Sequence, residues 1–151
     1  MAQSLARVFV HVVFSTKNRY PFLADRSVRE EMHAYIGGAF KSMDCPVVVV
    51  GGVADHVHIL CILSRKHSIS HVMKEVKAQS SRWVKTKGAM MRKFEWQRGY
   101  GIFSVNPDGA DAVRRYIRNQ EENHRRMPFT DEYRGILMEN DVEYDERYVW
   151  D

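Results

Sequence analysis

The sequence predicts an α+β fold: a ferredoxin-like or RRM-like sandwich with an antiparallel sheet, helices on one face, and an added C-terminal helix that bears Tyr116. Two observations predict it. Segments with strand composition and segments with helical spacing follow one another as strand, helix, strand, strand, helix, strand, helix, and the first six match a split βαβ arrangement. Only residues 53–56 separate the two middle strands, so we expect these strands to pair as a hairpin.

The first half of the chain contains three expected strands and one expected helix. Residues 5–16 hold a near-continuous run of β-branched and aromatic side chains, which is typical of a strand covered on both faces. Residues 25–43 carry apolar side chains at spacings of three and four, which predicts a helix. Two short apolar segments, 46–52 and 57–63, are the expected strands of the hairpin.

The second half contains two expected helices and one expected strand. Residues 69–85 have one apolar face, with lysines and arginines on the others, and are expected to be helical. Residues 102–105 are expected to form the last strand. Asn106 and Pro107 suit a helix start, because Asn offers a capping side chain and Pro fits the first turn. This third helix is expected to run to about Arg126.

Length and composition predict one domain and a short tail. A chain of 151 residues has the length of a single domain, and its 44% hydrophobic and 28% charged residues are ordinary for a globular protein. We expect residues 1–127 to form this domain and residues 128–151 to form an acidic tail that packs on it or extends from it. The tail is not expected to contact nucleic acid. Its candidates for packing are Phe129, Ile136, Leu137, Tyr148 and Trp150.

Composition argues against several classes of protein. No apolar run is long enough to span a bilayer, and the N-terminus lacks the pattern of a secretory signal. Cys45 and Cys61 match no zinc spacing, so we expect two reduced, buried thiols in a cytosolic protein. The net charge of +4 permits a polyanion as partner without establishing one.

The run from Asp55 to Leu60 places two histidines on an expected strand with one residue between them. Residues i and i+2 of a strand point to the same face, so His56 and His58 are expected to project side by side. Two neutral imidazoles at this spacing can chelate one divalent cation, and Asp55 can support one of them by a hydrogen bond. The alternative is a pair of inert, hydrogen-bonded histidines at a strand edge.

A second candidate site lies in the third helix, where Tyr116 and Gln120 are four residues apart and share a face. The amide oxygen of Gln120 can add a hard ligand to a metal, and the phenol of Tyr116 can act as a nucleophile. The ordinary pKa of a phenol is about 10, and a metal nearby would favour the phenolate. The alternative is a tyrosine that packs in the core.

The segment from Arg65 to Arg98 is rich in lysine, arginine and aromatic residues and nearly free of acidic ones. Cations suit phosphates and aromatic rings suit stacking on bases, so the segment indicates a surface for single-stranded nucleic acid. The alternative is a solvated helix face. With the basic turn after the first strand, this segment supplies the candidate DNA-binding residues, which are Lys17, Arg19, Arg65, Lys74, Lys77 and Arg82.

Together these features predict phosphodiester chemistry. A metal held by the histidines would polarise a phosphodiester and neutralise its developing charge, and the phenolate oxygen would attack phosphorus and leave a phosphotyrosine link. Two alternatives stay open. One is a non-catalytic, regulatory protein that binds single-stranded nucleic acid on the same fold. The other is a metal-dependent phosphodiesterase that uses water as its nucleophile.

The chain resembles the single-tyrosine HUH transposases of small bacterial insertion sequences, the IS200-like transposase family. The resemblance covers about residues 5–126 and rests on the run Asp55–Leu60, the segments 12–20, 77–82 and 96–105, and the helix Val113–Gln120. It implies a two-fold homodimer in which the tyrosine helix of one subunit completes the site of the other. It also implies that single-stranded DNA is cut and rejoined at the ends of a mobile element, through a 5′-phosphotyrosine intermediate and with recognition of DNA hairpins.

The resemblance also implies roles for individual residues. Tyr116 would be the nucleophile, and His56, His58 and Gln120 would be the protein ligands of Mg²⁺ or Mn²⁺. Asp55, just before the histidines, would be auxiliary. Tyr116 is preferred over the other tyrosines because none of them has a glutamine four residues on. Such an enzyme would act in the bacterial cytoplasm, at the nucleoid.

Overall fold

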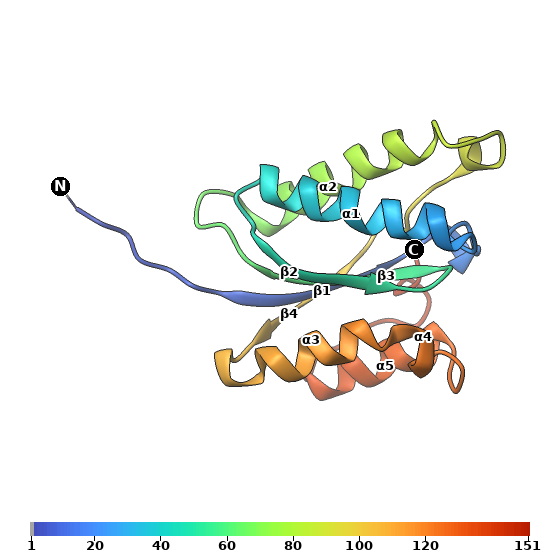
Figure 1. Cartoon of the computed structure of the whole chain (residues 1–151). Helices are drawn as coiled ribbons and strands as arrows, with labels where there is room; N and C mark the ends of the chain where they lie inside the picture. The colour runs from blue at the N-terminus through green and yellow to red at the C-terminus, as the bar shows by residue number, and fades with distance from the viewer. Residues whose placement is uncertain (1) are drawn as a thin grey trace.

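A computed structural model describes residues 2–151 (Figure 1). Four strands form one sheet in the order β2-β3-β1-β4, with every neighbouring pair antiparallel: β1 (Phe9–Ser15), β2 (Val47–Gly52), β3 (His56–Ile62) and β4 (Gly101–Val105). Helix α1 (Arg26–Ser42) connects β1 to β2, and helix α2 (Ile69–Val84) connects β3 to β4. The predicted ferredoxin-like arrangement is therefore confirmed, including the hairpin of β2 and β3.

Three further helices follow the sheet, namely α3 (Ala110–Arg118), α4 (Gln120–Asn123) and α5 (Phe129–Glu139). Figure 1 shows α1 and α2 on one face of the sheet and α3, α4 and α5 on the other. The sheet is therefore covered on both faces, as the apolar run of the first strand predicts. Within residues 2–151, no helix is both long and apolar enough to cross a bilayer.

The pleat of β3 sends alternate side chains into the two helical layers. One set joins the core beneath α1 and α2, namely Val57, Ile59 and Cys61. On the opposite face, Leu60 packs against Ile117 of α3. His56 and His58 alternate with the first set and so share the face of Leu60. The sheet itself therefore aims both imidazoles at the layer of α3, α4 and α5.

Helix α3 lies close against β2 at Gly51. A Cβ atom there would lie 2.4 Å from the carbonyl oxygen of Ile117, so only glycine allows this approach. We expect Gly51→Ala to lower the unfolding free energy by about 1–3 kcal/mol, because the helix must move away. Gly38→Ala in α1 is the control, since a Cβ there meets no atom within 4 Å and alanine favours a helix. Urea unfolding measures both, and equal stability of Gly51→Ala and wild type would contradict the close approach.

The first strand is shorter than predicted. It begins at Phe9 rather than at residue 5, because Phe9 pairs with Ile62 on one side and with Val105 on the other. Both neighbouring strands end at these residues, so among residues 2–151 no strand lies beside the segment that precedes Phe9. Residues 2–8 are accordingly exposed.

The third helix starts as predicted but is interrupted. The side chain of Asn106 accepts a backbone N–H bond, and a 3-10 turn, Pro107–Gly109, leads into α3. The prediction that the helix runs to about Arg126 is wrong, because α3 ends at Arg118 and the chain bends at Asn119, with φ −96° and ψ 21°, before α4. Asparagine is poorly suited to helix interiors, since its side chain competes for backbone hydrogen bonds.

The segment after Pro128 packs on the sheet through α5. The helix and two strands share one cluster, made of Phe129, Tyr133, Ile136 and Leu137 with Val13 of β1 and Phe103 of β4. Trp150 packs against this cluster. Tyr148, also a candidate for packing, is instead 62% exposed. The acidic tail thus covers the same sheet face as α3, while the division of the chain at residue 128 stays a prediction.

Candidate active site

His56 and His58 lie side by side on β3 and are fully buried. Each imidazole is held from behind by a hydrogen bond at Nδ1. His56 bonds to Oδ1 of Asp55 at 2.7 Å, and His58 bonds to Nε2 of His11 at 2.8 Å. These contacts fix the orientation of both rings, and both Nε2 atoms face the layer of α3, α4 and α5.

Tyr116 and Gln120 reach the imidazoles from α3 and α4 of the same chain. Oε1 of Gln120 lies 3.0 Å from Nε2 of His56, and the amide is almost fully buried. The ring of Tyr116 stands edge-on to that of His58, with 5.8 Å between the centroids and 82° between the planes. The four side chains that the sequence singles out for chemistry therefore meet at one place in a single chain.

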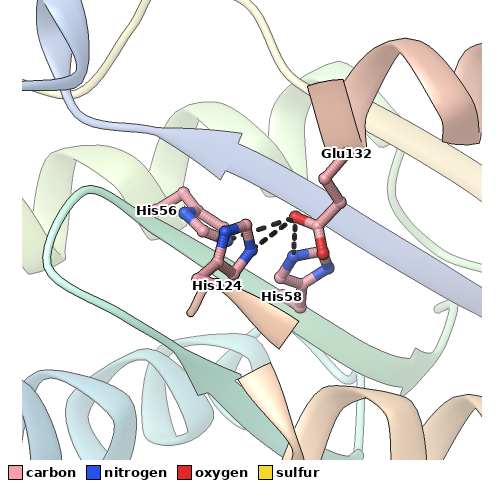
Figure 2. A group of neighbouring side chains, drawn as sticks. All are labelled: His56, His58, His124 and Glu132. Atoms are coloured by element: carbon pink, nitrogen blue, oxygen red, sulfur yellow. Dashed lines mark hydrogen bonds and ion pairs between the residues drawn. The ribbon is translucent and has the colours of Figure 1, made fainter. Parts of the chain in front are cut away.

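Two residues that sequence reasoning missed belong to the same cluster: Glu132 in the first turn of α5, and His124 directly after α4 (Figure 2). Oε1 of the carboxylate lies 3.0 Å from Nε2 of His58, 3.0 Å from Nε2 of His124 and 3.3 Å from Nε2 of His56. One oxygen atom of the acidic tail thus contacts three imidazoles.

The other carboxylate oxygen of Glu132, Oε2, faces α3 and α4. It accepts a hydrogen bond from the amide nitrogen of Gln120 at 3.0 Å and another from the hydroxyl of Tyr116. A single carboxylate therefore links the imidazole group to the phenol and the amide. The side chain of Glu132 is only 3% exposed, so these partners replace the water that an ion requires.

Two signals in the sequence point to the missed residues. Tyr116, Gln120 and His124 follow one another at intervals of four, so the spacing that pairs the first two extends to the third. Glu132 comes three residues after Phe129 and four before Ile136, which places a carboxylate on the apolar face of an amphipathic helix. A carboxylate in that position has to find polar partners elsewhere in the fold.

Burial and hydrogen bonding divide the charges within the cluster. Burial opposes charge on His56, but hydrogen bonds to Asp55 and Glu132 outweigh it and raise the pKa of this imidazole to about 9. Burial lowers the pKa of His58 to about 4, so this ring is neutral. Burial also acts against charge on Glu132, yet its hydrogen bonds to the histidines hold the pKa of the carboxyl well below its usual range. The carboxylate is therefore ionised and faces a protonated His56.

The phenol of Tyr116 is held in its protonated form. Burial and the neighbouring Glu132 carboxylate both raise its pKa above the ordinary value, so a phenolate needs a positive charge close by. The cluster can hold one, because each of four side chains offers a ligand atom and these atoms all lie within 4.8 Å of one another: His56, His58, His124 and Glu132. Imidazole nitrogens and a carboxylate oxygen are ordinary ligands of divalent ions, so the residues fit such a group.

Three of the candidate DNA-binding residues, Lys74, Lys77 and Arg82, belong to α2, which lies on the other side of the sheet from the imidazoles. Lys17, Lys74 and Lys77 line a cavity of about 770 Å³ beside α2. The ammonium group of Lys77 donates to the carbonyl oxygens of Gln97 at 2.8 Å and Arg98 at 3.1 Å, and burial lowers its pKa to about 8. Lys77 therefore holds the loop before β4.

The remaining basic candidates are divided between paired and exposed positions. Lys17 forms an ion pair with Glu95 at 3.0 Å, and the guanidinium of Arg19 lies 5.5 Å from the ring centroid of Trp150. The exposed ones are Arg65, Lys74 and Arg82. The structure brings none of these side chains to the imidazole cluster, and their contact with DNA stays a prediction.

The chain has recognisable relatives. The family model described as "Transposase IS200 like" matches residues 4–120. A candidate transposase from Deinococcus radiodurans R1 is 21% identical, with a TM-score of 0.62 over 80% of this chain and 95% of that one. The REP-associated tyrosine transposase bound to a REP hairpin is 15% identical, with a TM-score of 0.58 over 82% of this chain and 74% of that one. No curated protein matches. Because the family model spans most of its length, the chain belongs to the IS200-like transposases.

Proposed function

We propose that this transposase cuts and rejoins single-stranded DNA with the hydroxyl of Tyr116 as nucleophile. The observation that carries the proposal is the meeting of Tyr116, Gln120 and the His56–His58 pair around one carboxylate, within one chain. A packing tyrosine would not require three imidazoles beside it. An inert histidine pair would not require a phenol and an amide beside it.

The proposed step is a transesterification. The Tyr116 oxygen forms a bond to phosphorus, the bond from phosphorus to the 3′ oxygen breaks, and the phenolic proton ends on that oxygen. The products are a 5′-phosphotyrosine link and a free 3′-hydroxyl, and rejoining is the reverse step with another 3′ end. A divalent cation, Mg²⁺ or Mn²⁺, held by His56, His58 and Gln120 would polarise the phosphodiester and favour the phenolate. Asp55 acts behind His56 and fixes the orientation of its ring.

We infer that the DNA partner carries a hairpin next to the cleavage site. Two findings support this inference: the REP-associated relative is bound to a hairpin, and this chain has exposed basic side chains on the face that α2 covers. We assign the exposed Arg65, Lys74 and Arg82 to this contact first, with Lys17, Arg19 and Lys77, which already have partners within the chain, as its remaining candidates. The homodimer with exchanged tyrosine helices stays a prediction, and the single chain already holds a phenol beside its own imidazoles.

The function is tested with single-stranded oligonucleotides taken from the imperfect hairpins that flank the gene. We expect the wild-type chain with Mn²⁺ or Mg²⁺ to form a covalent adduct that survives denaturing electrophoresis. It should retain a 3′-end label and release a 5′-end label with a free 3′-hydroxyl. A chelator should abolish the adduct.

Two outcomes would contradict the proposal. Release of both fragments without an adduct would indicate hydrolysis by water. Binding that ignores the chelator, with no cleavage at all, would indicate a binding protein.

A further inference from the structure

The tail helix and the turn before it bring two further donors to the imidazole pair (Figure 2). We propose that His124 and Glu132 are also metal ligands, and that the resulting set of three imidazoles and one carboxylate prefers a first-row transition ion, from Mn²⁺ to Zn²⁺, over Mg²⁺. This inference rests on the proposed function, because it takes His56 and His58 as ligands of the same ion. Gln120 remains the neutral oxygen donor beside them.

All three imidazoles are oriented in the same way. Nδ1 of His124 bonds to the carbonyl oxygen of Met127 at 2.9 Å, just as Nδ1 of His56 and of His58 is held by Asp55 and His11. Each ring is therefore fixed from behind and presents its Nε2 atom to the carboxylate. Metal-ligating histidines show this pattern, in which the nitrogen away from the ion is held by a carboxylate, a carbonyl or another polar group.

The two oxygens of Glu132 have separate partners. Oε1 contacts only imidazole nitrogens among the hydrogen bonds and ion pairs of residues 2–151, whereas Oε2 accepts from Tyr116 and Gln120. Oε1 is thus the atom placed to bind an ion. Through Oε2 the same carboxylate orients the phenol, so the ligand and the nucleophile are held by one side chain.

The distances suit a shared ion. Ligand atoms bound to one ion at about 2.1 Å lie roughly 3 to 3.4 Å from each other. Oε1 of Glu132 lies 3.0 to 3.3 Å from the three Nε2 atoms, which is the separation expected between the carboxylate oxygen and each imidazole nitrogen around one ion. The ligand atoms are also largely shielded from solvent, because His56 and His58 are fully buried and Glu132 is almost so.

The donor chemistry selects the class of ion. Mg²⁺ prefers oxygen ligands and keeps several waters, and a buried site with three nitrogen donors suits it poorly. Imidazole nitrogen suits ions of the transition series, whose affinities for a given nitrogen site rise from Mn²⁺ toward Cu²⁺. Adding His124 to the pair on β3 therefore shifts the preference away from Mg²⁺.

The test uses the metal-free full chain and Co²⁺ as the probe, because Co²⁺ bound by nitrogen ligands absorbs visible light. We expect saturable absorption in the wild type that survives about a thousandfold excess of Mg²⁺. Glu132→Gln and His124→Gln should each weaken Co²⁺ binding at least about tenfold. The matched controls are Asp131→Asn, at the exposed position next to Glu132, and His71→Ala, at an exposed position of α2. Both should bind Co²⁺ as the wild type does.

Three outcomes are distinguishable. Wild-type Co²⁺ affinity in both glutamine variants, with binding lost in His58→Ala, would overturn this inference and leave the proposed function intact. Wild-type affinity in His58→Ala would overturn the proposed metal site itself. Displacement of Co²⁺ by Mg²⁺ would overturn the preference. Circular dichroism of the metal-free variants checks folding. If Glu132→Gln does not fold, Glu132→Asp takes its place, and we expect the same loss of Co²⁺ affinity.

Discussion

Replacing Tyr116 by Phe should abolish the covalent protein–DNA adduct and leave DNA binding unchanged. The variant removes one oxygen atom, which in the proposed step forms the bond to phosphorus, and it keeps the half-buried ring in place beside His58. Loss of a nucleophile is expected to lower adduct formation at least about a thousandfold. Denaturing electrophoresis measures the adduct, and a mobility shift at low salt measures binding.

The matched control is Tyr148→Phe, which removes a hydroxyl from a tyrosine that is 62% exposed. It should form the adduct at the wild-type rate. An adduct of wild-type yield in Tyr116→Phe would show that another group attacks the DNA. Cleavage that continues without any adduct would show that water does so.

Replacing His58 by Ala should have the second largest effect. The imidazole is fully buried among the candidate ligands, so its loss removes a proposed metal donor and also leaves Nε2 of His11 without its partner, Nδ1 of His58. We expect adduct formation to fall roughly a hundredfold or more, and the residual reaction to be insensitive to a chelator. His71→Ala on the exposed face of α2 is the control, and circular dichroism checks that both variants fold.

The same variant shows where the site is assembled. His58→Ala mixed with Tyr116→Phe restores activity only if the tyrosine helix of one subunit completes the site of another. The single chain holds Tyr116 beside its own His58, so we expect no restoration. Restored adduct formation would instead support the exchanged homodimer implied by the family resemblance.

Much of the fold could be predicted because it follows from local patterns in the sequence. The apolar run that becomes β1 indicated a strand covered on both faces, and the short connection between β2 and β3 indicated a hairpin. The period of a strand placed His56 and His58 on one face, and the period of a helix placed Tyr116 and Gln120 together. Nothing in these periods says which distant faces meet, so the convergence of the two pairs had to come from the structure.

The part of the site that sequence reasoning missed depends on a change of chain direction. His124 and Glu132 lie on either side of the turn between α4, which ends at Asn123, and α5, which begins at Phe129. Their approach depends on the path of that turn and on how α5 packs against Val13 and Phe103. Spacing alone can suggest that a buried carboxylate needs partners, but it cannot say that those partners are three imidazoles on other elements.

The basic residues show a different limit. Composition counts cations without separating those that stabilise the fold from those that face a ligand. Lys77 donates to the carbonyl oxygens of the loop before β4, and Lys17 pairs with Glu95. Arg65 and Arg82 are exposed and free to meet a phosphate backbone, so they are the better first targets for weakening DNA binding.

One measurement tests the central claim most directly: mass spectrometry of the purified adduct after nuclease trimming and protease digestion. The proposed function requires a nucleotide linked through its 5′ phosphate to the side-chain oxygen of Tyr116. In a reaction without metal, the same peptide should carry no nucleotide. A nucleotide on any other side chain, or an unmodified Tyr116 in material that has cut the DNA, would contradict it.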